Sequence, residues 1–275
     1  MQKAIVLVLV ALVVLAGCGK KADYYSQKAN EYLKQGDIDN AIDQFEKAAK
    51  ANPSSHEIQN ALGAALSMRG DFALAAQHFK QAVTLKKDFL EGHYNLGRAL
   101  TETGDAKGAI MEFKKVVQLD STYALAYFSV GGLYVKMGMP DEAVKAYKTA
   151  LHYDPSLKQV YLNLAATYVG LKDYDSAMSV LATGREKSPK NAQMAVMAGR
   201  VALLKRDFPQ AIALLQEANQ LNPQDAFARN DLATAMNLSG KTKEAIAIWE
   251  QVLAMNPEPA LAQAVQKNLD EAKKK

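Results

Sequence analysis

The sequence of 275 residues has little of what several protein classes need: it contains one cysteine, four histidines and one long apolar run. One cysteine cannot form a disulfide within the chain, which excludes a disulfide-rich scaffold. The single apolar run excludes a polytopic membrane protein. The formal net charge of +4 is too small over this length to indicate nucleic-acid binding. Hydrophobic residues make up 49% of the chain and charged residues 23%, which is typical of a folded protein and not of a disordered one.

No group of residues typical of catalysis or metal binding is visible in the sequence. The histidines, His56, His78, His93 and His152, include no pair at metal-ligand spacing. There is no glycine-rich phosphate loop and no Gly-x-Ser-x-Gly nucleophile motif. We therefore expect no enzymatic activity, no metal and no bound cofactor.

The first 17 residues have the features of an export signal. A basic start ending in Lys3 precedes thirteen apolar residues, Ala4 to Ala16. A helix of that length spans about 20 Å, which is too short to cross a bilayer core of about 30 Å. The following Leu15-Ala16-Gly17-Cys18 resembles the bacterial lipobox. The resemblance implies cleavage before Cys18 and a covalent lipid on its thiol. The alternative is a plain signal peptide or anchor with an incidental cysteine.

The residues after Cys18 bear on membrane sorting. Gly19 stands where many inner-membrane lipoproteins have aspartate, so the sequence resembles the class sorted to the outer membrane. This resemblance implies a protein on the inner leaflet of the outer membrane that faces the periplasm. Residues 18–21, with Lys20 and Lys21, are expected to form a short tether, and the two lysines favour anionic headgroups.

The rest of the chain repeats with a period of 34 residues. The pairs Gly36-Asp37, Gly70-Asp71 and Gly104-Asp105 are 34 residues apart, and the spacing continues without insertion or deletion. The chain therefore divides into seven segments: 22–55, 56–89, 90–123, 124–157, 158–191, 192–225 and 226–259.

Four positions of the repeat have a consistent residue type. Position 8 is glycine or alanine, and position 20 is always alanine, which allows two antiparallel helices to approach closely. Position 24 is large, and we expect its side chain to fill the space between one helix pair and the next. Position 32 is proline in five of the seven segments, which ends the second helix. The large residues are Phe45, Phe79, Phe113, Tyr147, Leu181, Leu215 and Trp249.

This pattern resembles the tetratricopeptide repeat over 238 of the 275 residues. The resemblance implies an all-α solenoid, a right-handed superhelix of seven helix-turn-helix repeats. Residues 260–275 follow the repeats, and apolar residues at helical spacing from Ala260 to Leu269 predict a helix that caps the seventh repeat. The remaining lysines, Lys273 to Lys275, form a basic tail.

In this family the first helix of each repeat lines an inner groove, with positions 2, 5, 6, 9, 12 and 13 pointing inward. Position 5 is apolar in repeats 3 to 5, position 6 includes asparagines, which can pair with a peptide backbone, and arginines at position 9 (Arg98 and Arg200) can meet a carboxylate. The candidate partner-binding residues are Tyr94, Asn95, Arg98, Phe128, Leu162 and Asn163. The alternative is that position 5 only packs against the second helix of the next turn. No repeat has lysine at position 5, so the carboxylate clamp for chaperone C-termini is not expected.

These features together favour a membrane-anchored, periplasm-facing adaptor that binds an envelope protein or an extended peptide. Similar lipoproteins act as pilotins in pilus assembly, gather cell-wall enzymes or accompany exopolysaccharide export. Two alternatives stay open. One is a carbohydrate-binding export component that stacks sugars on Tyr94, Tyr127, Phe128 and Tyr161. The other is a structural lipoprotein that associates with itself.

Overall fold

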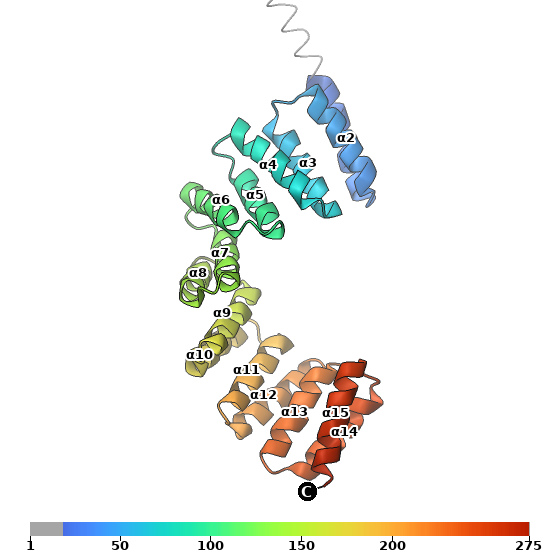
Figure 1. The fold of residues 1–275 in the computed structure, drawn as a ribbon, viewed down its shortest axis with the longest axis vertical. Coiled ribbons are helices and arrows are strands. Elements are labelled where there is room, and N and C mark those ends of the chain that lie inside the picture. Colours follow the sequence, from blue (N-terminus) through green and yellow to red (C-terminus); the bar gives the residue numbers. More distant parts are fainter. Residues whose placement is uncertain (1–18, 275) are drawn as a thin grey trace, which may run out of the picture. The chain divides into compact units, whose positions relative to one another are not determined.

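The computed structural model describes residues 19–274, and all regular structure in this range is helical (Figure 1). None of the described helices has the length and apolar character that crossing a membrane requires. The first described helix covers residues 19–34. The others are α2 (Ile38–Ala51), α3 (His56–Arg69), α4 (Phe72–Leu85), α5 (Leu90–Glu102), α6 (Ala106–Leu119), α7 (Ala124–Lys136), α8 (Pro140–Tyr153), α9 (Lys158–Gly170), α10 (Tyr174–Lys187), α11 (Ala192–Leu204), α12 (Phe208–Leu221), α13 (Ala226–Leu238), α14 (Thr242–Ala254) and α15 (Pro259–Ala272).

The expected all-α fold of paired helices is confirmed, and its helix starts follow the sequence period. Each of repeats 2 to 7 begins at the first residue of a helix, from His56 in α3 to Ala226 in α13. One segment differs from expectation. Residues 19–21, placed in a tether by the sequence pattern, are helical and continue into the first helix, where Ala22 is only 1% exposed.

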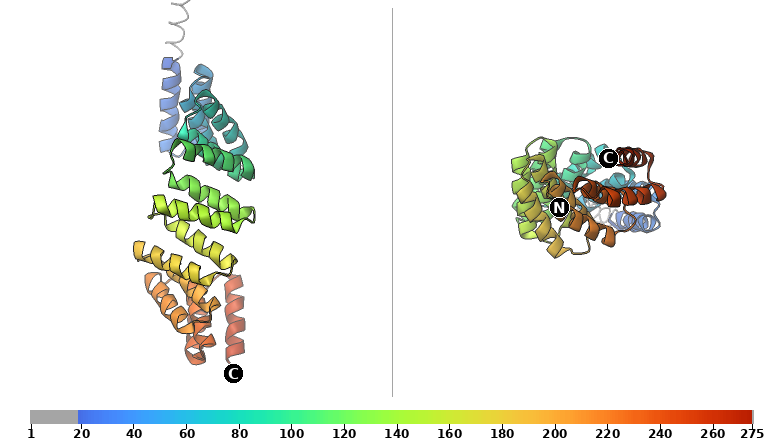
Figure 2. Two further views of the ribbon diagram at one scale, coloured as in Figure 1. Left: turned by 90° about the vertical axis from the view of Figure 1, so that its left-hand side faces the viewer. Right: turned by 90° about the horizontal axis from the view of Figure 1, so that it is seen from below.

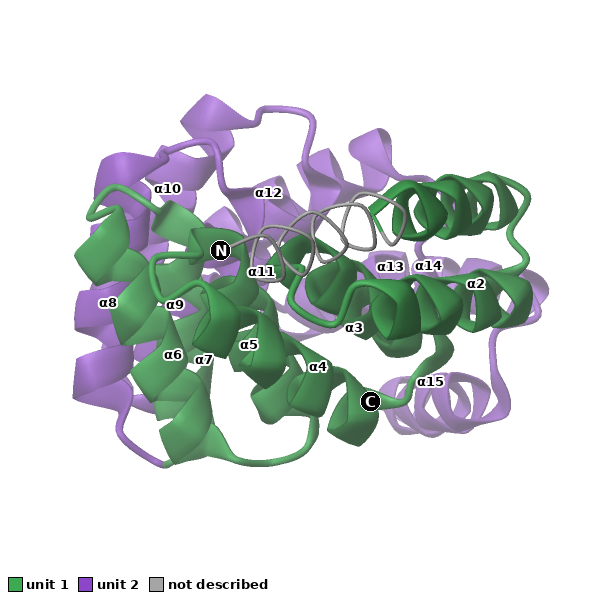
Figure 3. Ribbon diagram, turned by 90° about the horizontal axis from the view of Figure 1, so that it is seen from above, with its two compact units in different colours: residues 1–137 green, residues 138–275 purple. Residues whose placement is uncertain are grey.

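The chain forms two compact units, which meet in sequence between Met137 and Gly138 (Figure 3). Unit 1 contains the helices up to α7, and unit 2 contains α8 to α15. The fourth repeat therefore contributes one helix to each unit. Within each unit every helix packs against its neighbours in sequence, as α3, α4 and α5 do in unit 1 and α11, α12 and α13 do in unit 2 (Figure 2).

A small residue in the first helix of a repeat faces a large one in the second. A Cβ atom on Gly97 would lie 2.8 Å from the Phe113 ring, and one on Gly199 would lie 2.6 Å from Leu215. Real Cβ atoms do not come this close, so a larger residue at Gly97 or Gly199 would push the facing side chain away. The large residue at position 24 thus packs first within its own repeat. Phe79 also shares a buried cluster with Leu96 of the next repeat, so it makes the expected contact between helix pairs as well.

The Gly-Asp pairs form the turn between the two helices of a repeat. Their glycines have positive φ values from 77° to 95°, which end the first helix. The aspartates begin the second helix, because a side-chain oxygen such as that of Asp37 accepts a hydrogen bond from the backbone N–H three residues later. Two repeats use other residues in the same left-handed turn: Lys172 has φ 61° and Arg206 has φ 60°.

Replacing Lys172 or Arg206 by glycine should stabilise the protein. A residue with a Cβ atom pays to adopt the left-handed conformation, and glycine does not, so each change is expected to add up to about 1 kcal/mol. The measurement is the midpoint of urea unfolding. As a control, Gly104→Ala, where φ is 86°, should lower stability by a similar amount. A Lys172→Gly variant that is less stable than the natural chain would contradict this account.

The turns between repeats are tied by side chains that the sequence pattern did not single out. In four repeats the residue at position 4 donates a hydrogen bond to the backbone carbonyl six residues before it, at position 32 of the previous repeat. The side chains of histidine, tyrosine and arginine can all donate this hydrogen bond. Ala195, at the same position in repeat 6, has no side-chain donor. The pairs are His93 with Lys87 (3.0 Å), Tyr127 with Ser121 (3.2 Å), Tyr161 with Pro155 (3.0 Å) and Arg229 with Pro223 (2.8 Å).

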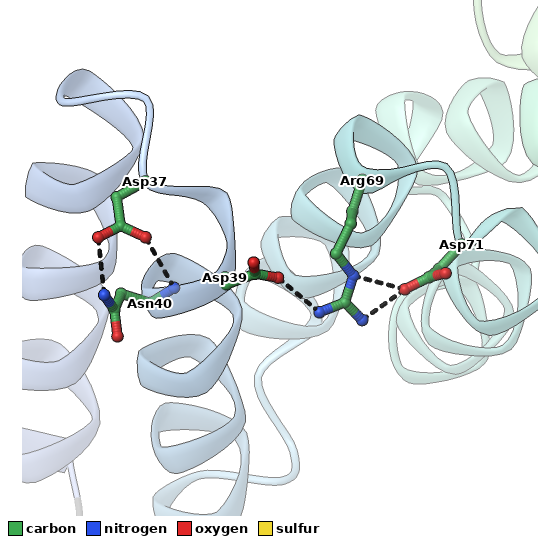
Figure 4. A network of polar contacts seen from close by, with 5 residues as sticks. All are labelled: Asp37, Asp39, Asn40, Arg69 and Asp71. Atoms are coloured by element: carbon green, nitrogen blue, oxygen red, sulfur yellow. Dashed lines mark hydrogen bonds and ion pairs between the residues drawn. The ribbon is translucent and has the colours of Figure 1, made fainter.

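Ion pairs link neighbouring repeats at the other end of the helix pairs. The Arg69 guanidinium lies 3.0 Å from Asp39 of the previous repeat and also pairs with Asp71 (Figure 4). In unit 2 the amino group of Lys205 lies 2.5 Å from Asp175, at the same two repeat positions. These side chains are exposed to solvent, so each pair adds little stability and mainly fixes geometry.

Helix α15 covers the end of the seventh repeat, as a capping helix should. It packs against α13 and α14 and buries Leu261, Val265 and Leu269. Pro259 starts this helix, where its missing N–H costs nothing. The helix extends past the expected Leu269 to Ala272, which is 4% exposed.

Candidate functional site

The first helices of repeats 5, 6 and 7 surround a hollow in unit 2, which we call the inner hollow. Its volume is about 730 Å³. All of its lining residues except Val201 and Asp225 occupy the repeat positions that the family resemblance places in the groove. The apolar lining comes mainly from Leu162, Val169, Val196, Met197, Leu204 and Phe227, and the polar lining from Asn163, Gln193, Arg200 and Asp225.

The inner hollow offers apolar surface to a ligand. Leu204 is 51% exposed and Phe227 is 48% exposed, which is unusual for large apolar side chains in a folded protein. Polar groups lie among them, including Asn163, whose side-chain oxygen accepts a hydrogen bond of 2.9 Å from Gln159. An apolar cavity with a few placed polar groups is the usual form of a binding site. Gln193, Met197 and Phe227 were not singled out from the sequence, although they stand at inward positions of the repeat.

The structure separates the six predicted groove residues. Leu162 and Asn163 line the inner hollow of unit 2. Asn95 and Arg98 line a smaller hollow of about 440 Å³ in unit 1, between α3, α4 and α5. The other two predicted residues, Tyr94 and Phe128, lie on α5 and α7, are partly buried and line neither hollow.

In repeats 3 and 7 the residue at position 5 contacts the second helix of its own repeat. The ring centroid of Tyr94 lies 5.7 Å from that of Phe113, and 5.2 Å from that of Tyr123. In repeat 7 the indole N–H of Trp249 donates a hydrogen bond of 3.0 Å to the side chain of Asn230. In these two repeats position 5 makes contacts inside the repeat, which differ from the alternative in the sequence analysis, whereas Leu162 and Val196, at the same position, line the inner hollow.

The asparagines of unit 1 bond to each other and to a glutamate. The side-chain amide of Asn95 donates to the oxygen of Asn60 at 3.0 Å, and the amide of Asn60 donates to Glu91 at 3.1 Å. This chain links three first-helix residues of repeats 2 and 3. One donor of Asn95 is therefore already used within the protein.

The two arginines at position 9 have different surroundings. Arg200 lies 2.5 Å from the carboxylate of Asp231 on α13. Burial raises the pKa of Asp231, and the hydrogen bond from Arg200 acts against this rise. Arg98 is exposed and forms no ion pair with any residue from 19 to 274, because the equivalent of Asp231 in repeat 4 is Ser129. Only Arg98 is thus available to a ligand without displacing an acidic partner.

The aromatic residues considered for sugar stacking are partly used in the fold. Tyr161 is 4% exposed, and its hydroxyl is bound to the carbonyl of Pro155. Tyr94 packs against two aromatic rings, and the hydroxyl of Tyr127 donates to Ser121. Neither hollow therefore presents a row of aromatic faces.

The histidines take part in local contacts. His93 is buried, with one ring nitrogen 2.6 Å from Glu112 and the other 3.0 Å from the Lys87 carbonyl. A ring nitrogen of His78 lies 2.8 Å from the side-chain oxygen of Gln59, and burial lowers the pKa of His78. Across residues 19–274, no group of three or more candidate ligands is placed to hold a metal ion. Cys18, the expected lipid attachment site, lies outside the described residues.

Comparison with known proteins identifies the repeat. Models of the tetratricopeptide repeat match residues 26–90 and 69–124, and also 134–199 and 202–272. No curated protein matches the chain. Among solved structures, MamA protein is 28% identical, with 64% of this chain and 96% of MamA covered and a TM-score of 0.59.

Two further structures share the fold at lower identity. The pilF protein of Pseudomonas aeruginosa is 21% identical, with 75% of this chain and 94% of pilF covered and a TM-score of 0.60. YrrB, described as a TPR protein with an unusual peptide-binding site, is 20% identical, with coverages of 70% and 99% and a TM-score of 0.57. The helix pairs, their period and these matches agree: the chain belongs to the tetratricopeptide repeat family.

Proposed function

We propose that this protein is a membrane-anchored adaptor that binds an extended segment of a partner protein in the inner hollow and takes part in assembling a complex of the bacterial envelope. Tetratricopeptide repeat proteins generally mediate protein–protein interactions. The observation that supports the proposal best is the inner hollow itself. Its exposed Leu204 and Phe227, close to Asn163 and Arg200, suit apolar side chains joined by a polar backbone.

The proposed anchor depends on the N-terminal sequence. Cys18 follows a short apolar run and is the single cysteine of the chain. Two or more acyl chains on one residue hold a protein stably on a membrane, whereas one chain does so only marginally. Gly19, in place of aspartate, supports the outer membrane as the site.

Site-specific photo-crosslinking in the native envelope tests the proposal. A photoreactive residue at Ala166, an exposed alanine that lines the inner hollow, should crosslink to a defined set of proteins. The matched control is Ala213, an exposed alanine on α12 that lines neither hollow. The yield of crosslinked protein should be at least about tenfold lower with the photoreactive residue at Ala213 than at Ala166. The double substitution Phe227→Glu/Leu204→Glu should abolish the crosslinks at Ala166.

The other results of this experiment point elsewhere. Equal crosslinking at Ala166 and Ala213 would contradict a groove-binding adaptor. Crosslinks only between copies of this chain would favour the self-associating alternative. Retention on cell-wall glycan with no protein crosslink would favour the carbohydrate-binding alternative.

A further inference from the structure

Unit 2 has another hollow, at the turn between repeats 5 and 6, which we call the basic hollow. Its volume is about 600 Å³. Three lysines line it: Lys158 at the start of α9, Lys187 at the end of α10 and Lys190 in the turn. The lining contains no acidic residue. None of the three lysines forms an ion pair with another residue in the described range, so three positive charges face one space without compensation.

The seven repeats provide an internal comparison for these lysines. Lys158 is at position 1, where every other repeat has alanine, leucine or histidine. Lys187 is at position 30, where the other repeats have alanine, leucine, tyrosine or methionine. Lys190 is at position 33, where they have uncharged polar or acidic residues. Each lysine is thus unique at its position, and all three meet at one turn. The repeat architecture does not require a basic residue at any of these places.

The basic hollow adjoins the inner hollow. Gln193, on the first turn of α11, lines both of them. Lys158 and Leu162 are four residues apart on α9, so they lie on the same face of that helix, and one lines the basic hollow while the other lines the inner hollow. A chain that lies along the apolar lining therefore reaches the lysines without leaving the surface of unit 2.

We infer that the partner segment has a defined charge pattern: apolar side chains for the inner hollow, followed at one end by a cluster of acidic residues for the basic hollow. This inference rests on the proposed function and names the chemistry of the partner. Charge complementarity supports it, because three ammonium groups without an ion-pair partner at the rim of an apolar site attract carboxylates, repel a basic flank and gain no charge–charge attraction from a neutral one. Such charges discriminate between partners more than they add affinity.

The test measures binding of two synthetic peptides to the full chain by fluorescence anisotropy. Both have twelve residues with alternating apolar and serine residues, and one ends in three aspartates while the other ends in three asparagines. Each is made with the flank at either end. The aspartate peptide should bind about tenfold more tightly at low salt, and the ratio should fall towards one in 0.5 M NaCl because salt screens exposed charges.

Two triple variants separate the basic hollow from general charge. In Lys158→Gln/Lys187→Gln/Lys190→Gln the preference for the aspartate peptide should disappear while the asparagine peptide binds as before. In Lys145→Gln/Lys243→Gln/Lys267→Gln, which removes three exposed lysines elsewhere in unit 2, the preference should remain. Equal loss in both variants, or no preference in the natural chain, would overturn the inference.

Two other outcomes are also decisive. If neither peptide binds, the proposed function fails and the inference fails with it, whereas binding of both peptides with equal affinity overturns the inference alone. Vesicles containing phosphatidylglycerol form a separate arm. If the first triple variant loses vesicle binding but keeps the peptide preference, the basic hollow contacts the membrane and the inference is wrong.

Discussion

Replacing Phe113 by alanine is expected to destabilise the protein by about 3–5 kcal/mol. Its ring is 1% exposed, lies against Gly97 of α5 and contacts the ring of Tyr94. The change removes a large apolar side chain and leaves a cavity between the two helices, because Gly97 has no side chain that could fill it. Urea unfolding followed by circular dichroism measures the loss, and hydrogen exchange should place it in the repeats around α5 and α6.

The control for this prediction lies on the same helix. Met111 on α6 is 65% exposed, so Met111→Ala should change the free energy of unfolding by less than about 0.5 kcal/mol. A loss below about 1 kcal/mol for Phe113→Ala would mean that the contact at positions 8 and 24 does not determine how the two helices pack.

Exchanging residues 1–18 for an export leader that is cleaved before Gly19 should move the protein from the membrane to the soluble fraction. The natural chain is expected to resist salt and alkaline washing, because several acyl chains on Cys18 would each contribute about 0.8 kcal/mol per buried CH₂ group. The exchanged chain lacks these, and we expect at least about 90% of it in the supernatant. Fractionation followed by immunoblotting gives the ratio.

Mass spectrometry of the extracted protein supplies the control. The natural chain should have the mass of residues 18–275 plus a diacylglyceryl group on Cys18 and any further acyl group. Circular dichroism should show that both forms are folded. Recovery of the natural chain in the wash, or an unmodified Cys18, would rule out the lipid anchor.

The period of the sequence predicted the helices because each turn residue has a local reason to be there. Glycine at Gly104 accepts the left-handed conformation, and Asp105 caps the next helix through the N–H of Gly108. Even the exceptions obey the period, since Lys172 and Arg206 adopt the same conformation without being glycine. The 34-residue spacing therefore predicted the helix boundaries more reliably than the type of any single residue did.

The candidate site was harder to predict because the sequence gives positions on a helix but not the partners of side chains. The hydrogen bond between Trp249 and Asn230 and the ion pair between Arg200 and Asp231 each join residues on different helices. A residue type alone could not show that Arg200 has an acidic partner whereas Arg98 forms no ion pair within residues 19–274. The basic hollow was not predicted, because only the fold brings Lys158 near Lys187 and Lys190, about thirty positions later.

The contact between positions 8 and 24 has a consequence for how such a chain can change in length. Gly97 and Phe113, like Gly199 and Leu215, stand sixteen residues apart within a single 34-residue segment. Duplicating or deleting one whole segment therefore adds or removes both members of the pair together, and no neighbour is left with an unmatched cavity or clash. The number of repeats can then vary during evolution with little compensation elsewhere, and the inward side chains are free to diverge for new partners.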